Sequence, residues 1–266
     1  EITGNNIVIP EYHGVMGALG AACLARQYRE LKQTLPQAQP VFPPDTKLKS
    51  IALRALSTKK DLLGSSDAPL VWRNLFFPTE ILNAMDLKVL TLETYAAMLA
   101  RSPKKVKTAF DHAACKGFSG ETCSFLRVLE GIKLPRPVFG VSTSQPCQQG
   151  ERVFRDLIRN YGLEDNFYSL QTPSSPTERA VEQVAEGLLE AVGLLEKQLG
   201  RKMDMRRLSE ACEFSNHAQY YSHKANSLRL SSPPLLRGSQ ASYFASIFSQ
   251  LWGKPELVEI QKQFYE

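Results

Sequence analysis

The chain has 266 residues and a mass of 29.7 kDa, enough for one or two domains with hydrophobic cores. Its 43% apolar and 22% charged residues exclude a wholly disordered or fibrous chain, and a net charge of +5 is too small an excess to indicate nucleic-acid binding. No apolar run is long enough for a membrane span, and the five cysteines lack the dense, even spacing of a secreted disulfide framework. We therefore expect a cytoplasmic protein that acts neither on nucleic acid nor in a membrane.

The first 69 residues are predicted to fall into two parts. The β-branched run Asn6–Pro10 predicts a strand, and Gly14–Leu31 predicts a helix with a flat face of small residues. Residues 1–31 are too few to form a core, so we expect them to close a domain that lies upstream in a larger chain. Residues 32–69, with four prolines within nine residues and then a basic stretch, are predicted to be a linker with a short helix at 50–56.

From residue 70 onward, predicted strands alternate with predicted helices. Strands are expected at 87–92, 138–142 and 167–170, and the apolar periodicity of 151–161 predicts a helix that stops at Gly162. Strands and helices that alternate at this spacing predict an α/β fold, with a doubly wound parallel sheet of the Rossmann or flavodoxin-like kind.

Two long helices are predicted to follow the sheet. The first spans 176–199, with Ser175 as its N-cap in a capping box and Gly200 at its end. Its expected buried stripe consists of Val181, Val184, Leu188, Val192, Leu195 and Leu199. The second is capped by Asp204 and runs to about Leu228. We expect an α/β domain over 70–230, and further helices over 231–266 that begin a second, truncated domain.

Three residues with chemically useful side chains are expected at the carboxyl ends of these strands, where open parallel sheets bind ligands. Glu93 follows the strand 87–92, Cys147 lies in the loop after 138–142, and Cys123 precedes a predicted helix over 124–130. A thiol at a helix N-terminus has a lowered pKa, which makes a thiolate ligand available.

Other interpretations of these residues remain open at this point. Free cysteines are most often small buried apolar residues, which we expect of Cys23, Cys115 and Cys212, and spacing alone favours burial for Cys123 and Cys147 as well. A zinc site from His112, Cys115 and Cys123 has unconvincing spacing, and Glu93 could simply cap a helix. The histidines His13, His217 and His223 read as ordinary surface or core residues. No glycine-rich phosphate loop with a following lysine supports ATP chemistry within this chain.

Several segments together resemble the 2-hydroxyacyl-CoA dehydratase and benzoyl-CoA reductase family. The resemblance covers roughly residues 70–266 and is carried by the runs Trp72–Leu82, Met85–Glu93 and Thr122–Arg127, by the strand that leads to Cys147, and by the two long helices. Independently, Ile7–Pro10 with Val15–Ala22 is similar to the closing strand and helix of the activator ATPases that serve these enzymes, which belong to the sugar kinase, Hsp70 and actin superfamily.

The resemblance implies an oxygen-sensitive protein with a four-iron four-sulfur cluster held by three cysteines. Cys123 and Cys147 match the first two ligands, and the third is expected beyond the end of this chain. It also implies an activator ATPase as electron donor, either upstream in the same chain or separate, an acyl-CoA substrate, and a second dehydratase subunit. Glu93 is the candidate for a polar group that assists proton movement near the cluster.

Two further functions stay open beside this one. The first is a related reductase that holds a double-cubane cluster and reduces small molecules. The second is a non-catalytic electron-relay or docking module fused to its activator.

Overall fold

The computed structural model describes residues 47–64, 67–99 and 102–266, without the side chains of 58–64. The strand and helix expected within 1–31, together with Cys23 and His13, lie outside these residues. Residues Pro44–Glu266 form one compact unit. Its elements, in chain order, are α2 (Lys47–Gly64), β1 (Leu70–Arg73), α3 (Thr79–Ala84), β2 (Lys88–Thr91), α4 (Leu92–Leu99), α5 (Pro103–Cys115), α6 (Ser124–Gly131), β3 (Phe139–Thr143), α7 (Gln148–Arg159), η2 (Glu164–Asn166), β4 (Phe167–Leu170), α8 (Glu178–Leu199), α9 (Met205–Ser227), η3 (Leu228–Leu230), α10 (Gly238–Phe248) and α11 (Pro255–Tyr265).

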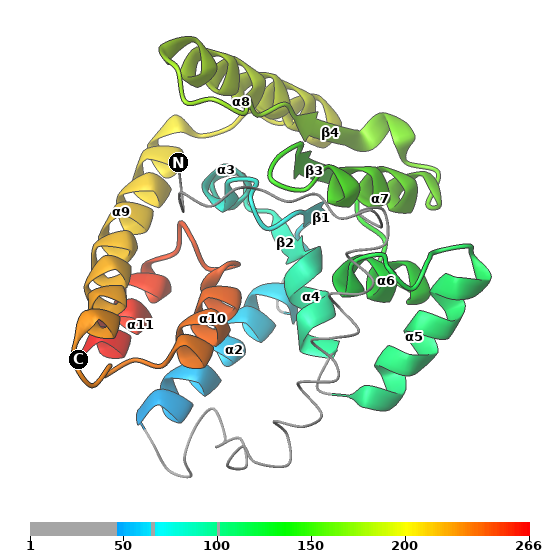
Figure 1. Cartoon of the computed structure of the whole chain (residues 1–266). Helices are drawn as coiled ribbons and strands as arrows, with labels where there is room; N and C mark the ends of the chain where they lie inside the picture. Colours follow the sequence, from blue (N-terminus) through cyan, green and yellow to red (C-terminus); the bar gives the residue numbers. More distant parts are fainter. Residues whose placement is uncertain (1–46, 65–66, 100–101) are drawn as a thin grey trace, which may run out of the picture. The chain divides into compact units, whose positions relative to one another are not determined.

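The four described strands form one parallel sheet in the order β2-β1-β3-β4 (Figure 1). The central strand β1 pairs with both β2 and β3, so that Trp72 lies beside Leu90 on one side and Gly140 on the other. From β1 the chain first forms β2 on one side of β1, and then β3 and β4 on the other side. The strand order therefore reverses between β1 and β3. Such a reversal opens a crevice at the carboxyl ends of the two strands.

Helices cover both faces of the sheet, as a doubly wound fold requires. Neighbouring residues of a strand point to opposite faces, and accordingly Val71 and Trp72 belong to different core clusters. The Val71 cluster contains side chains from α3 and α8, among them Leu82 and Leu195, and the Trp72 cluster contains side chains from α4, α6 and α7. The expected α/β fold with a doubly wound parallel sheet is confirmed.

The predicted strands are present, and one strand was missed. The strands β2, β3 and β4 fall within one or two residues of the expected ranges, whereas β1 was not predicted. Its four residues, Leu-Val-Trp-Arg, end in a charged side chain and are too few to show a period. The charge is tolerated because Arg73 is buried and hydrogen bonded at the end of the strand.

The helix expected at 50–56 is longer than predicted. The α2 helix spans Lys47–Gly64, and Ile51, Ala52 and Ala55 are buried where it packs against α10, α11 and β2. The burial of these three residues explains why a basic, mixed sequence holds a helix of this length, since packing of an apolar face contributes more than intrinsic propensity.

The two long helices are present, with corrections at the start of the first. The N-cap of α8 is Thr177, whose side chain accepts from the amide of Ala180, and not Ser175. Val181 was wrongly placed in the buried stripe, because it is 68% exposed in the first turn. Gly200 ends the helix in a left-handed conformation with φ of 65°, and Asp204 caps α9, both as predicted.

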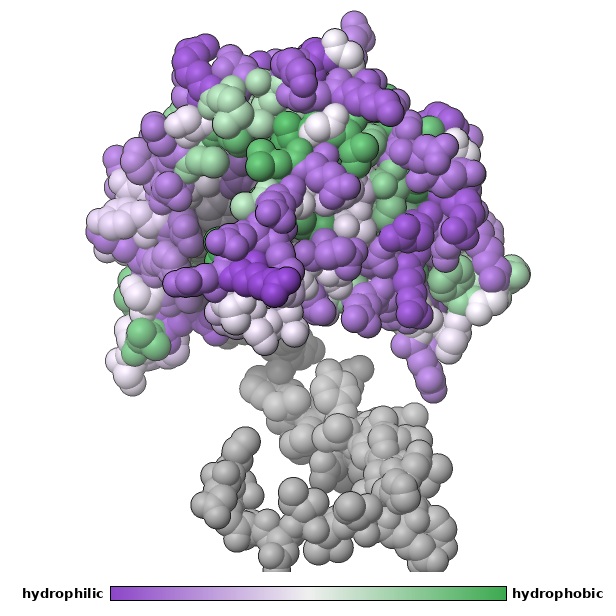
Figure 2. Space-filling view, turned by 90° about the horizontal axis from the view of Figure 1, so that it is seen from above, coloured by the Kyte–Doolittle hydropathy of each residue, from purple (hydrophilic) through white to green (hydrophobic). Residues whose placement is uncertain are grey.

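Some apolar side chains of α8 therefore face outward. Val181 and Leu189 are each 68% exposed. Figure 2 looks onto the side where α8 lies in Figure 1 and shows apolar side chains gathered between polar ones on this face. Within the described ranges, no helix is both long enough and apolar enough to cross a membrane.

Candidate functional site

Cys123, Cys147 and Glu93 line one cavity of about 320 Å³. They reach it from three separate elements: Glu93 from the start of α4, Cys123 from the residue before α6, and Cys147 from the residue before α7. The loop Asn74–Phe76, which follows β1, forms another wall. The cavity thus lies at the carboxyl ends of β1, β2 and β3, beside the point where the strand order reverses.

The Cys147 thiol caps the helix α7. Its Sγ accepts a hydrogen bond from the amide of Gly150 at 3.2 Å. A Cβ at Gly150 would lie 3.3 Å from that sulfur, so glycine leaves room beside it. The loop before Cys147 is held in place, because the Thr143 hydroxyl donates to the Gln145 carbonyl at 2.6 Å and the Gln145 amide donates to the Thr172 hydroxyl at 3.1 Å. Cys147 is exposed.

Cys123 occupies the N-cap position of α6 without a side-chain capping bond. Its carbonyl accepts from the amide of Arg127 at 3.0 Å, which starts the helix, while its thiol is exposed. The α6 helix is held against α5 by Arg127, whose guanidinium lies 4.0 Å from the centre of the Phe110 ring. Arg127 also donates to the carbonyl of Gly120 at 3.1 Å, which fixes the loop that leads to Cys123.

Glu93 presents a partly unpaired carboxyl group to this site. Its Oε2 is buried and has no hydrogen-bond partner among the described residues. Burial raises the pKa of the Glu93 carboxyl above its ordinary value, although the backbone amides of Glu93 and Leu75 and the charge of Arg73 act in the opposite direction. Glu93 is the second residue of α4 and belongs to the first turn of the helix.

Arg73 lies behind the wall of the cavity and orders it. Burial lowers the pKa of Arg73 to about 10. Its guanidinium donates to the Thr91 hydroxyl at 2.9 Å, to the carbonyls of Leu75 at 3.1 Å and Phe77 at 2.5 Å, and to the carbonyl of Ser249. One side chain therefore ties β1, β2, the loop after β1 and the end of α10 together.

Two cysteines that were expected to be buried, Cys115 and Cys212, are exposed. Cys115 ends α5 at the surface, and Cys212 lies on α9 at the edge of an apolar groove. The prediction for Cys212 failed because the face of α9 that packs inward contains the smaller residues Ala211 and Ala218. Neither Cys115 nor Cys212 lines the cavity of Cys123.

The part of the chain that the structure describes contains no group of three or more histidine, cysteine or acidic side chains placed to hold a metal ion. The zinc interpretation thus has no support there, and His112 instead lies with its Nδ1 3.1 Å from the carbonyl of Gly131. Cys123, Cys147 and Glu93 line one cavity, but the three side chains do not form such a group.

Several residues that shape the site were not singled out from the sequence. Arg73 ends the strand that was missed and Asn74 follows it, while Phe76 lines the cavity from a loop, Phe125 from α6 and Ser246 from α10. A signal existed only for Gly150, since the backbone amide three residues after an N-cap side chain is positioned to donate to it.

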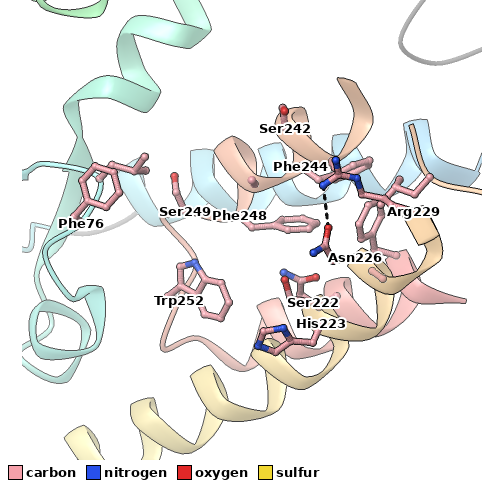
Figure 3. A pocket seen from close by; sticks show the side chains of 17 residues that line it. Phe76, Ser222, His223, Asn226, Arg229, Ser242, Phe244, Phe248, Ser249 and Trp252 are labelled. Carbon is pink, nitrogen blue, oxygen red and sulfur yellow. Dashed lines mark hydrogen bonds between the residues drawn. The ribbon is translucent and has the colours of Figure 1, made fainter. Parts of the chain in front are cut away.

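A second cavity of about 540 Å³ lies beyond the same loop. It is lined by Phe244, Phe248 and Trp252 and by polar side chains of α9, and it shares Leu75 and Phe76 with the first cavity (Figure 3). At its far end the Arg229 guanidinium donates to the Asn226 side chain at 3.2 Å.

Comparisons with known proteins point to one family. The profile of the 2-hydroxyglutaryl-CoA dehydratase D-component matches residues 74–266. The alpha subunit of (R)-2-hydroxyisocaproyl-CoA dehydratase from Clostridioides difficile is 22% identical over 212 residues, which cover 74% of this chain. The chain spans about half the length of that relative, since the match covers 51% of it. With a profile match over most of its length, the chain belongs to the 2-hydroxyglutaryl-CoA dehydratase D-component family.

Proposed function

We propose that this chain contributes the iron–sulfur site of a 2-hydroxyacyl-CoA dehydratase or a closely related acyl-CoA reductase. The observation that carries the proposal is that Cys123 and Cys147, from different crossover units, line one cavity with exposed thiols. A family profile over residues 74–266 supports it. The cluster type and the substrate are part of the proposal.

The residues present fit a four-iron four-sulfur cluster as two of its three protein ligands. Two thiols at helix starts suit thiolate ligation, and the Gly150 amide at 3.2 Å supplies the kind of hydrogen bond to sulfur that tunes such clusters. When bound, the cluster would supply a low-potential electron to the acyl-CoA thioester. The third cysteine is expected from a part of the protein outside this chain.

Glu93 is proposed to hold and move a proton in this cavity. Its buried, unpaired Oε2 faces no competing donor among the described side chains, and its raised pKa favours the protonated form more than in an ordinary glutamate. Arg73 limits that shift and fixes the loop above it.

The proposal implies partners. An electron donor is required, for which we propose an activator ATPase, fused upstream or separate, and a second dehydratase-like subunit is proposed to complete the enzyme. The reducing cytoplasm is the proposed location, because free cysteines that bind iron persist there.

Iron analysis of the full-length protein tests the proposal. Anaerobically purified protein should contain about four irons per chain, against about eight for a double-cubane reductase and none for a docking module. Cys123→Ser and Cys147→Ser should each lower the iron content, whereas Cys115→Ser, which alters an exposed thiol outside the cavity, should not. Wild-type iron content in either of the first two variants would overturn the assignment of that residue.

A further inference from the structure

The cavity of Cys123 and Cys147 has walls that are mainly apolar. Leu75 and Phe76 come from the loop after β1, Ala97 from α4, and Phe125 and Leu126 from α6. Phe76 and Phe125 are 52% and 45% exposed, although large aromatic side chains are usually covered. A hydrocarbon chain that entered between them would be removed from water on several sides.

The described lining of the cavity also lacks a positive charge. Among the described residues that line it, none is lysine or arginine, and the one carboxyl group is that of Glu93. Two arginines on adjoining elements are engaged elsewhere. Arg73 donates to three backbone carbonyls and to Thr91, and Arg127 lies against Phe110 and donates to Gly120.

From this lining we infer that the cavity receives an uncharged, apolar acyl chain and rejects an acyl chain that ends in a carboxylate. The terminal carboxylate of such an acyl chain would lose its hydration and find no cation among the described lining residues. It would also share the cavity with the carboxyl group of Glu93. This inference rests on the proposed function, because it names the kind of acyl-CoA that the same site takes. It separates this chain from any relative that accepts a dicarboxylic acyl group.

Two CoA thioesters of equal chain length test the inference. Pentanoyl-CoA and glutaryl-CoA both carry five-carbon acyl groups and differ in a terminal methyl against a terminal carboxylate, and neither has a 2-hydroxyl group to eliminate. Titration calorimetry on the full-length protein under anaerobic conditions should show pentanoyl-CoA binding at least about tenfold more tightly. Equal affinity, or tighter binding of glutaryl-CoA, overturns the inference and leaves the proposed function standing if iron is bound. Binding of neither thioester overturns both the inference and the acyl-CoA part of the proposed function.

A positive charge added to the lining tests whether the missing cation causes the preference for an apolar acyl chain. Ser246 is exposed, lines the cavity from α10, and donates only to a carbonyl of its own helix, at Ser242. Ser246→Arg should raise the affinity for glutaryl-CoA and shrink the preference for pentanoyl-CoA. Ser239→Arg adds the same charge to the same helix at an exposed position that lines neither cavity, and it should leave the preference unchanged. If Ser246→Arg leaves the ratio of the two affinities at the wild-type value, the missing cation is not the reason for selectivity and the inference falls.

Discussion

The amide of Gly150 donates a hydrogen bond to the sulfur of Cys147 at 3.2 Å, and no side chain at Gly150 crowds that sulfur. The bond fixes the thiol at the first turn of α7 and directs it to the cavity that it shares with Cys123 and Glu93. The glycine is helical, so its role is to leave space rather than to allow an unusual backbone conformation. Substitution of Gly150 should therefore change the reactivity of the Cys147 thiol with little change in the free energy of unfolding.

Gly150→Ala is expected to change the free energy of unfolding by less than about 1 kcal/mol, because the helical preference of alanine offsets a contact at 3.3 Å. Alkylation of Cys147 by iodoacetamide should become slower, since the added methyl group lies beside Sγ. Gly193→Ala is the control: it is also helical, has no atom within 4 Å of the added Cβ, and should leave the alkylation rate unchanged. An unchanged rate in Gly150→Ala would show that this residue does not limit access to the sulfur.

Arg73→Met is expected to lower the free energy of unfolding by about 3 kcal/mol or more. The guanidinium satisfies the carbonyls of Leu75, Phe77 and Ser249, and methionine would leave the buried acceptors of Phe77 and Ser249 unpaired. Urea denaturation measures the loss. Arg152→Met, at an exposed position on α7, should change stability by no more than about 0.5 kcal/mol. Equal stability of the two variants would mean that Arg73 does not hold the wall of the cavity together.

Glu93 should make the protein less stable as the pH rises. Burial raises the pKa of its carboxyl above the ordinary value of 4.5, so between that value and the folded-state pKa the folded form binds more protons than the unfolded form. The stabilising contribution of the protonated group is complete below the unfolded-state pKa and is lost as the pH rises through the folded-state pKa. Glu93→Gln should therefore gain stability relative to wild type with rising pH, by up to about 1.4 kcal/mol per pH unit in that window.

Asp86→Asn provides a comparison of opposite sign. The hydrogen bond from Arg207 lowers the pKa of Asp86, so the stability that Asp86 contributes is present above its ordinary pKa and is lost as the pH falls through its folded-state pKa. The wild-type advantage over Asp86→Asn should shrink at low pH. Thermal unfolding of the two variants and the wild type from about pH 2 to about pH 8 gives both trends, because the Asp86 change falls below its ordinary pKa of 3.8. A Glu93→Gln difference that is constant across this range contradicts the buried position of the carboxyl group.

Much of the fold follows from local sequence because its elements have strong periods and caps. Gly200 and Asp204 end and begin helices for reasons that lie within a few residues, and β3 and β4 are short apolar runs bounded by polar loops. In contrast, the formation of β1 and the exposure of Val181 depend on which elements pack beside them, and local sequence does not contain that information. Four residues that end in Arg73 do not indicate a central strand without knowledge of the carbonyls that receive its guanidinium.

The candidate site divides in the same way. That Glu93 and Cys147 meet can be predicted, because they follow β2 and β3 and parallel strands bring their carboxyl ends to one edge, whereas Cys123 reaches the same cavity from the loop between α5 and α6. The apolar walls could not be predicted, since Phe76 and Ser246 approach the cavity from elements 170 residues apart in sequence. Exposure of Cys115 and Cys212 was likewise a property of packing, because smaller neighbours on the same helices fill the core instead.

Close packing of α5 on α6, the helix that positions Cys123, depends on Gly131. A Cβ at this position would lie 1.8 Å from the carbonyl oxygen of Ala109 on α5, and backbone cannot move aside as a flexible side chain does. Gly131→Ala should therefore lower the free energy of unfolding by about 3 kcal/mol, measured in urea.

The matched control for this variant is Gly120→Ala, in the loop before Cys123. No atom lies within 4 Å of a Cβ at Gly120, so this change should be neutral or should stabilise the chain by up to about 1 kcal/mol through the unfolded state. Gly131→Ala should in addition change the alkylation rate of Cys123, because α6 must shift to relieve the clash. If Gly131→Ala and Gly120→Ala unfold at the same urea concentration, α5 and α6 are not packed backbone to backbone, and the placement of Cys123 at the rim of the cavity loses its structural basis.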